Sequence, residues 1–446
     1  MSPSLAFRSA SSRRRTGLLA ALIGLLAWMT ADPALAVPSY SRQTGQECAT
    51  CHVGAFGPQL TPYGVKFKIG GYTETNGEDT KIPLSGMAVG TFTHTQANQS
   101  PPPARFSTND NAAVQELSAF VAGKLMDHVG AFAQVTYSGI DRKLVLDNVD
   151  LRITFDATLL DRNTTFGLSI NNNPTIQDPF NTLPAWRYPF VTSDLAPSPA
   201  HAPLLDGGLE GRVIGATAYA SMDNGFYAEA GGYGGLSRGF LQAVNVIDPT
   251  DPGSRLIGGA PYGRLAWFKD MRSQAVSLGI VAMSADLGVF GQRGRADHYR
   301  DIGADLAYQY LGDRTHVFTV ATSFIHEMQQ LDGSVRSGAA AHATQTMEQF
   351  NVTGSYTFDK TYGLTAKYFN NWGSADKLLY APTGKPDNSG LMFQADWSPF
   401  GKETSWGAPW ANVRVGVQYT AYNKFDGTTR HASDNNTLMG FVWTAF

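Results

Sequence analysis

After Lys81 and Ile82 the chain alternates between apolar and polar residues, and the alternation continues to its end. In 413–420, for example, every second residue is Val or Tyr, and the residues between them are Arg, Gly, Gln and Thr. Successive side chains of a β-strand point to opposite faces, so such segments predict strands with one apolar and one polar face. The alternation is clearest in seven segments, at 145–156, 302–310, 317–325, 350–358, 362–370, 391–397 and 413–421.

Short and long connections alternate between the predicted strands. The short ones include 127–128, 223–225, 312–314 and 359–361, and the long polar ones include 96–111, 172–208, 235–259, 331–344 and 375–389. Short periplasmic turns and long outer loops are typical of outer-membrane barrels. A soluble β-sandwich or β-solenoid can also alternate, but neither needs uniform strands of about ten residues. We therefore predict an antiparallel membrane barrel of about sixteen strands.

The closing segment, 441–446, departs from this pattern. Phe441 and Trp443 fall on the face that should line a polar lumen, and the alternation alone gives no reason for it. The terminal Phe446 is nevertheless what a final barrel strand is expected to carry.

Composition agrees with a membrane barrel. Charged residues make up 16% of the chain, where about a quarter is usual, while glycine (47 residues) and aromatic residues (11%) are abundant. Beyond the N-terminal region no segment has about 18 unbroken apolar residues, so no transmembrane helix is expected. The formal net charge is −3, and removal of residues 1–36, which carry a net +3, leaves about −6. A mildly acidic chain gives no sign of nucleic-acid binding.

Residues 1–36 have the pattern of a secretory signal peptide. Arg13, Arg14 and Arg15 precede an apolar run at 18–28, and Ala34-Leu35-Ala36 is a suitable cleavage site. The alternative is a membrane anchor, but the apolar run is short for a span. Export and a barrel together predict the outer membrane of a Gram-negative bacterium, with its lipid as the surrounding partner.

Cys48, Cys51 and His52 form a C-x-x-C-H motif, which is the attachment site of a c-type haem. Two thiols bind one porphyrin, and the adjacent imidazole reaches the iron. The chain has no other cysteine. A disulfide redox pair would be expected near a βαβ pattern, and a zinc site would need a second ligand pair; neither is visible. We therefore predict one covalently bound haem c, with His52 as the proximal metal ligand.

The sequence thus predicts an all-β chain in three parts: a signal peptide (1–36), a monohaem cytochrome c segment (37–80) and a porin-like barrel (81–446). For the distal iron ligand the candidate is Met87, at the periplasmic start of the first strand and with lumen-facing parity. Histidines at 94 and 128 are the alternatives, although the first should point to the opposite face of the strand and the second lies in a turn. A five-coordinate iron without a distal protein ligand is the remaining alternative. Three cations near the motif are candidates for pairing with haem propionates: Arg42, Lys66 and Lys68.

Segment 38–95 resembles a known family. The residues that carry the resemblance are PSYSRQTG at 38–45, the haem motif, LTPYG at 60–64, FKIGGY at 67–72, LSGM at 84–87 and FTHT at 92–95. They resemble the fused monohaem cytochrome–porins of iron-oxidising bacteria. The resemblance implies ferrous iron oxidation: electrons pass from extracellular Fe(II) through the haem to a periplasmic c-type cytochrome or another small carrier.

Two functions are compatible with the sequence. The first is an outer-membrane electron conduit, and the second is a diffusion porin whose haem segment is a periplasmic plug or redox sensor. For the first, a hard cation outside would need carboxylate or carbonyl contacts in the outer loops. Asp178, Asp194 and Asp206 are the candidates for those contacts.

Overall fold

A computed structural model describes residues 39–77, 83–248, 253–289, 296–400 and 411–446, with single positions at 250, 294, 402, 404 and 405. The predicted signal peptide, 1–36, and the boundary at Lys81 and Ile82 lie outside the described residues. The strands are β1 Leu84–Thr95, β2 Asn111–Met126, β3 Val129–Ser138, β4 Lys143–Leu159, β5 Arg162–Asn171, β6 Val213–Met222, β7 Phe226–Gly235, β8 Ser254–Ile257, β9 Gly259–Asp270, β10 Gln274–Val289, β11 Asp297–Tyr310, β12 His316–Gln330, β13 Thr344–Phe358, β14 Tyr362–Gly373, β15 Asn388–Trp397, β16 Asn412–Lys424 and β17 Thr437–Ala445.

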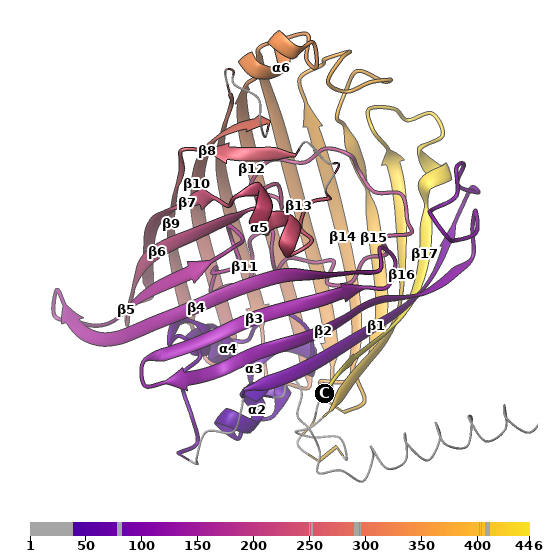
Figure 1. Cartoon of the computed structure of the whole chain (residues 1–446). Coiled ribbons are helices and arrows are strands. Elements are labelled where there is room, and N and C mark those ends of the chain that lie inside the picture. Colours follow the sequence, from indigo (N-terminus) through magenta and orange to yellow (C-terminus); the bar gives the residue numbers. More distant parts are fainter. Residues whose placement is uncertain are drawn as a thin grey trace, which may run out of the picture.

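The described strands close into one antiparallel barrel (Figure 1). Each strand pairs with the next along the chain, and β17 pairs with β1, where Met87 lies opposite Ala445 and Thr95 opposite Thr437. β8 and β9 both pair with β10 and act as one strand, interrupted at Gly258, whose φ is +71°. Counted this way the barrel has sixteen strands, as predicted, and all seven segments with the clearest alternation lie within strands.

The polarity of the barrel wall is the reverse of that of a soluble protein. On β16, Val417 is 53% exposed on the outside, whereas its neighbour Gln418 is 4% exposed in the lumen. Phe393, Leu364 and Ile302 are likewise exposed on the outer face. A closed barrel satisfies its backbone groups internally, and an apolar outer face suits lipid. The fold is therefore the predicted membrane barrel, and barrels of this kind belong to the outer membrane.

The helices are not part of the strand wall of the barrel. They are α2 Ser39–Thr44, α3 Cys48–Cys51, η1 Val53–Ala55, α4 Pro62–Ile69, α5 Arg238–Ala243, α6 Asp332–Ser337 and η2 Ala432–Asn435. Within the described ranges, every helix is too short or too polar to cross a membrane. Figure 1 shows α2, α3 and α4 at the end of the barrel that also carries the C-terminus and the short turns. By the usual asymmetry of these barrels, that end faces the periplasm.

The longest joint, between β5 and β6, folds into the lumen and not outward. Its apolar side chains Ile176, Leu183, Leu195 and Leu205 are at most 2% exposed. The Trp186 Nε1 donates a hydrogen bond to the carbonyl of Ile176, 2.7 Å away, which stabilises the folded-in conformation. We call residues 172–212 the inner loop.

The apolar lumen face of the last strand has a clear cause. Trp443 packs edge-on against Phe56 of the N-terminal segment, with ring centroids 4.7 Å apart. Phe441 and Met87 belong to the same buried cluster. These side chains face a packed protein segment and not water, so the departure from alternation marks where the N-terminal segment docks.

Candidate functional site

The haem motif forms a single helical turn, α3. The amide of His52 donates to the carbonyl of Cys48 at 2.9 Å, so Cys48 and Cys51 lie three residues apart on one side of the turn. Both cysteines are free, and each residue is half-buried. α4 packs directly on this turn: a Cβ at Gly64 would lie 2.4 Å from the carbonyl oxygen of Cys51, so only glycine allows this contact.

The side chains of the motif fit a covalent haem. One ring nitrogen of His52, Nδ1, is buried and has no hydrogen-bond partner among the described residues, a state that disfavours folding by about 1–3 kcal/mol. Burial lowers the pKa of His52 to about 4, so at neutral pH its imidazole is neutral, as a metal ligand must be. Burial also raises the pKa of Cys48 to about 11 and that of Cys51 to about 12. The motif thus offers two protonated thiols and one neutral imidazole.

The segment that follows the motif is fixed to the barrel wall by side chains from distant strands. Each bond is to a backbone carbonyl or a side chain of residues 55–60: Asn412 Nδ2 to Ala55 O (2.8 Å), Arg414 Nη2 to Phe56 O (2.7 Å), Asn181 Nδ2 to Pro58 O (2.7 Å), Gln59 Nε2 to Thr319 Oγ1 (2.5 Å) and Gln309 Nε2 to Leu60 O (2.7 Å). The donors and acceptors come from β11, β12, β16 and the inner loop. The N-terminal segment, residues 39–77, is therefore a plug built into the lumen and not a loose tether.

α4 ties the plug to the inner loop. Lys68 Nζ donates to the carbonyl of Ile176 at 2.9 Å and to Asn181 Oδ1 at 2.8 Å. Arg152 of β4 donates to the carbonyl of Lys68 at 2.7 Å and pairs with Asp150. Burial, reinforced by the charge of Arg152, lowers the pKa of Lys68 to about 7. The junction therefore places a weakly basic amine deep in the lumen.

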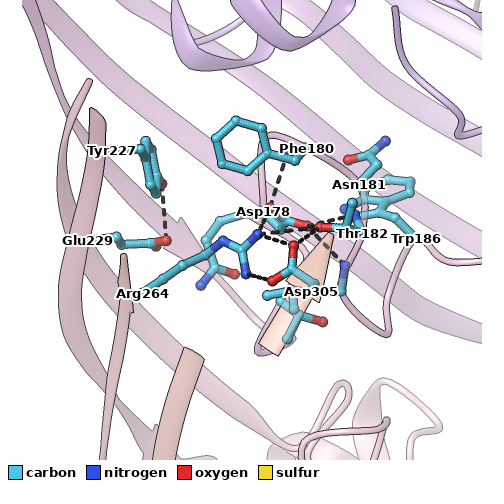
Figure 2. Close-up of polar contacts among 12 residues, drawn as sticks. Asp178, Phe180, Asn181, Thr182, Trp186, Tyr227, Glu229, Arg264 and Asp305 are labelled. Atoms are coloured by element: carbon cyan, nitrogen blue, oxygen red, sulfur yellow. Dashed lines mark hydrogen bonds and ion pairs between the residues drawn. The ribbon is translucent and has the colours of Figure 1, made fainter. Parts of the chain in front are cut away.

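A fully buried ion cluster lies beyond this junction (Figure 2). Arg264 Nη1 is 2.8 Å from Asp305 Oδ2, and its Nη2 is 3.2 Å from Asp178 Oδ1. Asp178 also accepts the backbone amides of Thr182 and Leu183 at 2.8 and 3.0 Å. Although burial opposes ionisation, Arg264 holds the pKa of Asp178 below its usual range. The cluster joins the inner loop to β9 and β11.

This geometry corrects one expectation about outer cation contacts. Asp178 does not lie in an outward loop: its charge is matched by Arg264 inside the lumen. Asp206 is paired with Arg187 and accepts from Gln349 Nε2 at 2.7 Å. Asp194 is the one of the three candidates that is exposed. Within the described part of the chain, no group of three or more His, Cys, Asp or Glu side chains is placed to hold a metal ion.

Of the candidates for distal iron ligand, Met87 is the one that lies in the lumen. It is 8% exposed and packs in the cluster that contains Phe56 and Trp443. His94 is exposed and pairs with Asp110, as its parity predicts, and His128 is exposed in the turn after β2. Iron ligation by Met87 stays a prediction.

The three cations proposed for propionate pairing all have protein partners. Lys66 pairs with Asp270 at 2.8 Å, and Arg42 Nη2 donates to the carbonyl of Leu84 at 2.9 Å. Lys68 binds the inner loop, as described above. In this structure these side chains hold the plug to the barrel.

Comparison with solved structures finds outer-membrane barrels that resemble this chain in fold. No protein-family model matches the chain, and no curated protein sequence matches it. Among solved structures, the chain is similar to an anion-selective porin from Comamonas acidovorans (11% identity, TM-score 0.47, 81% of this chain and 98% of that one). It is also similar to Salmonella typhi OmpF in complex with daunomycin (13%, 0.46, 81% and 97%) and to the channel DcaP of Acinetobacter baumannii (12%, 0.45, 81% and 96%). These likenesses concern the barrel fold alone.

Proposed function

We propose that this chain is an outer-membrane electron conduit. Its N-terminal plug would hold one haem c in the periplasmic mouth of the barrel and pass electrons from an extracellular reduced donor to a periplasmic carrier. The observation that supports this most directly is the position of Cys48, Cys51 and His52, which belong to a segment hydrogen-bonded to the barrel wall. A segment that served only as a periplasmic shuttle would not need these bonds.

The residues around the motif have distinct roles in this proposal. Cys48 and Cys51 hold the porphyrin, His52 is the proximal ligand and Met87 is the candidate distal ligand. A bound haem c supplies a one-electron iron couple whose potential depends on its ligands and its burial. Phe56, four residues after His52 in the sequence, belongs with Trp443 to a buried apolar cluster that would limit the access of water to the haem. Exclusion of water favours the less charged, reduced state and so raises the potential.

The filled lumen favours transfer of the electron and not of the donor. The plug lies in the periplasmic mouth beside a cavity of about 860 Å³ that is lined by Lys66, Ile69 and Asp270. Deeper in the barrel, the inner loop packs onto the plug through Lys68 and Asn181. With ferrous iron as donor, insoluble ferric product would therefore stay outside. The resemblance of 38–95 to cytochrome–porins of iron-oxidising bacteria supports Fe(II) as the donor and a small c-type cytochrome as the periplasmic partner.

A diffusion porin with a redox-sensing plug is the second candidate. The observation in its favour is a set of lumen cavities along β12–β17, of about 280, 60 and 20 Å³. The middle cavity shares Arg187 and Asn351 with the outer one, and Gln59 and Phe190 with the periplasmic one. Their small volumes suit water or small ions better than larger nutrients.

Two measurements separate these functions. In anaerobic stopped-flow mixing of purified oxidised protein with ferrous iron near neutral pH, we expect rapid appearance of the reduced haem spectrum. Failure of iron to reduce a haem that dithionite reduces readily would remove Fe(II) as the donor. In planar bilayers we expect small or no steady conductance. A large open conductance in the intact protein would instead favour the porin.

A further inference from the structure

The outer half of the lumen contains a cavity of about 280 Å³ between the inner loop and β13–β17. It is separate from the haem motif. Thr192 and Ser198, which line it, are exposed, so it communicates with the outer surface. On its inner side it adjoins the cavity of about 60 Å³, and Arg187 and Asn351 line both. These two side chains therefore stand at the junction between the two spaces.

The junction has buried hydrogen-bond donors without acceptors. Among the described residues, Arg187 Nη1 and Asn351 Nδ2 are both buried and have no partner. Asn351 as a whole is 5% exposed, and Lys367, on the neighbouring strand, is 7% exposed. The Lys367 ammonium lines the outer cavity and donates to the carbonyl of Tyr188 at 2.8 Å. Buried donors without acceptors are disfavoured by about 1–3 kcal/mol each, so such groups normally have a partner.

The charge at this junction is positive. Arg187 is paired with Asp206, which also accepts from Gln349. The Lys, Arg, Asp and Glu side chains that line the outer cavity are Arg187, Lys367 and Asp206, so two basic side chains face one carboxylate. Gln349 Oε1 is a buried acceptor that has no partner among the described residues, and Gln349 lines the same cavity. A ligand that suits this set carries negative charge, several acceptor oxygens and one hydroxyl proton.

We propose that Arg187, Asn351 and Lys367 form a binding site for a small oxyanion of the phosphate type in the outer half of the lumen. The guanidinium and the ammonium would give charge-assisted hydrogen bonds, and the Asn351 amide would give a third donor. The hydroxyl of monohydrogen phosphate would donate to Gln349. The site does not depend on the haem, because the cavity and its donors belong to the inner loop, β13 and β14.

Calorimetric titration of inorganic phosphate into the purified, haem-containing protein at pH 7 tests this site. We expect one binding event, and Lys367→Met should weaken it at least tenfold, as should Arg187→Gln. Lys424→Met is the matched control: this lysine lies at the outer end of β16, pairs with Asp387 and lines neither cavity. It should leave phosphate affinity unchanged.

Folding of each variant is measured separately from phosphate binding. Each variant should keep the mobility of the folded barrel in unboiled gel samples. If Lys367→Met, on strand β14, does not fold, Arg187→Gln still tests the site, because Arg187 lies outside the strands. The proposal is overturned if the wild-type protein gives no binding heat up to about 10 mM phosphate, a concentration that would fill most of a site with millimolar affinity. It is also overturned if folded Lys367→Met and Arg187→Gln bind phosphate as well as the wild type.

Discussion

Several charged residues in the lumen are held in buried ion pairs. Arg264 is shared between Asp178 and Asp305, and Arg152 pairs with Asp150, all with fully buried side chains. Removal of one member of such a set leaves an uncompensated buried charge, whereas an exposed pair contributes little. The buried cluster around Arg264 is therefore expected to limit the stability of the inner loop.

Arg264→Met tests this expectation. The change leaves two buried carboxylates without their cation, so the free energy of unfolding should fall by about 3–5 kcal/mol. The measurement is the urea dependence of the compact barrel form in unboiled gel samples. Arg162→Met is the control, because Arg162 is about half exposed and 3.8 Å from Asp223; its loss should be below about 1 kcal/mol. Equal losses in the two variants would contradict the role assigned to the cluster.

The thiol of Cys51 is predicted to carry the haem covalently. In Cys51→Ala, peroxidase-type haem staining after denaturing electrophoresis should fall strongly, since the thioether to Cys51 cannot form and only the bond to Cys48 remains. Mature protein of normal mobility, detected by a protein stain, is the control. Haem staining at wild-type strength in this variant would rule out the assignment.

Met87 is predicted to be the distal iron ligand. Met87→Ala should abolish any weak methionine-to-iron absorption at the red end of the spectrum and lower the midpoint potential, because a thioether ligand raises it. Met439→Ala is the matched control, since Met439 is 2% exposed in the same apolar cluster. If both variants change the spectrum equally, or neither changes it, Met87 is only a packing residue.

Among the elements, the strands could be predicted from sequence and the inner loop could not. Alternation depends on neighbouring residues, so segments such as 413–421 carry their own signal. The inward fold of residues 172–212 depends on contacts such as Arg264 with Asp178, which are far apart in the chain. For the same reason the expectation that Asp178 lies in an outward loop is wrong. The group of Arg187, Asn351 and Lys367 could not be predicted either. The sequence indicates only that Asn351 and Lys367 lie on the polar, lumen-facing side of their strands.

The contact between α4 and the inner loop is predicted to depend on pH through Lys68. Its pKa is about 7 in the folded protein and near 10.5 in the unfolded chain, because burial, and then Arg152, oppose its charge. Between these values the unfolded chain binds the extra proton, so stability should rise as pH increases from 7 to about 10. The slope from this group is at most roughly 1.4 kcal/mol per pH unit.

Lys68→Met separates this effect from other titrations. Urea midpoints at pH 7, 8.5 and 10 should rise with pH in the wild-type protein and rise less in the variant. The carboxylates of Asp150, Asp178 and Glu229, which favour the charged amine, are present in both proteins. A difference between the two pH profiles therefore comes from Lys68 itself. Parallel pH profiles for the two proteins would show that Lys68 does not titrate in this range.

At the scale of the whole molecule, the barrel and its plug are one structure. The haem motif and barrel class were predictable because both have local patterns. The docking of the plug was visible only as an anomaly, the inward Phe441 and Trp443, whose partner Phe56 lies more than 300 residues earlier. The proposed function, transfer of an electron across a membrane that keeps its permeability barrier, rests on this docked plug and on the inner loop packed against it.

Transfer across a sealed membrane tests this most directly. The purified protein is placed in liposomes that contain an oxidised small c-type cytochrome, and ferrous iron is added outside under anaerobic conditions. We predict that the enclosed cytochrome becomes reduced, that iron does not enter, and that liposomes with Cys51→Ala show much less reduction. Two results would contradict the account. In the first, iron added outside reduces the haem of the wild-type protein, but the enclosed cytochrome stays oxidised. In the second, the enclosed cytochrome becomes reduced only when iron enters the liposomes.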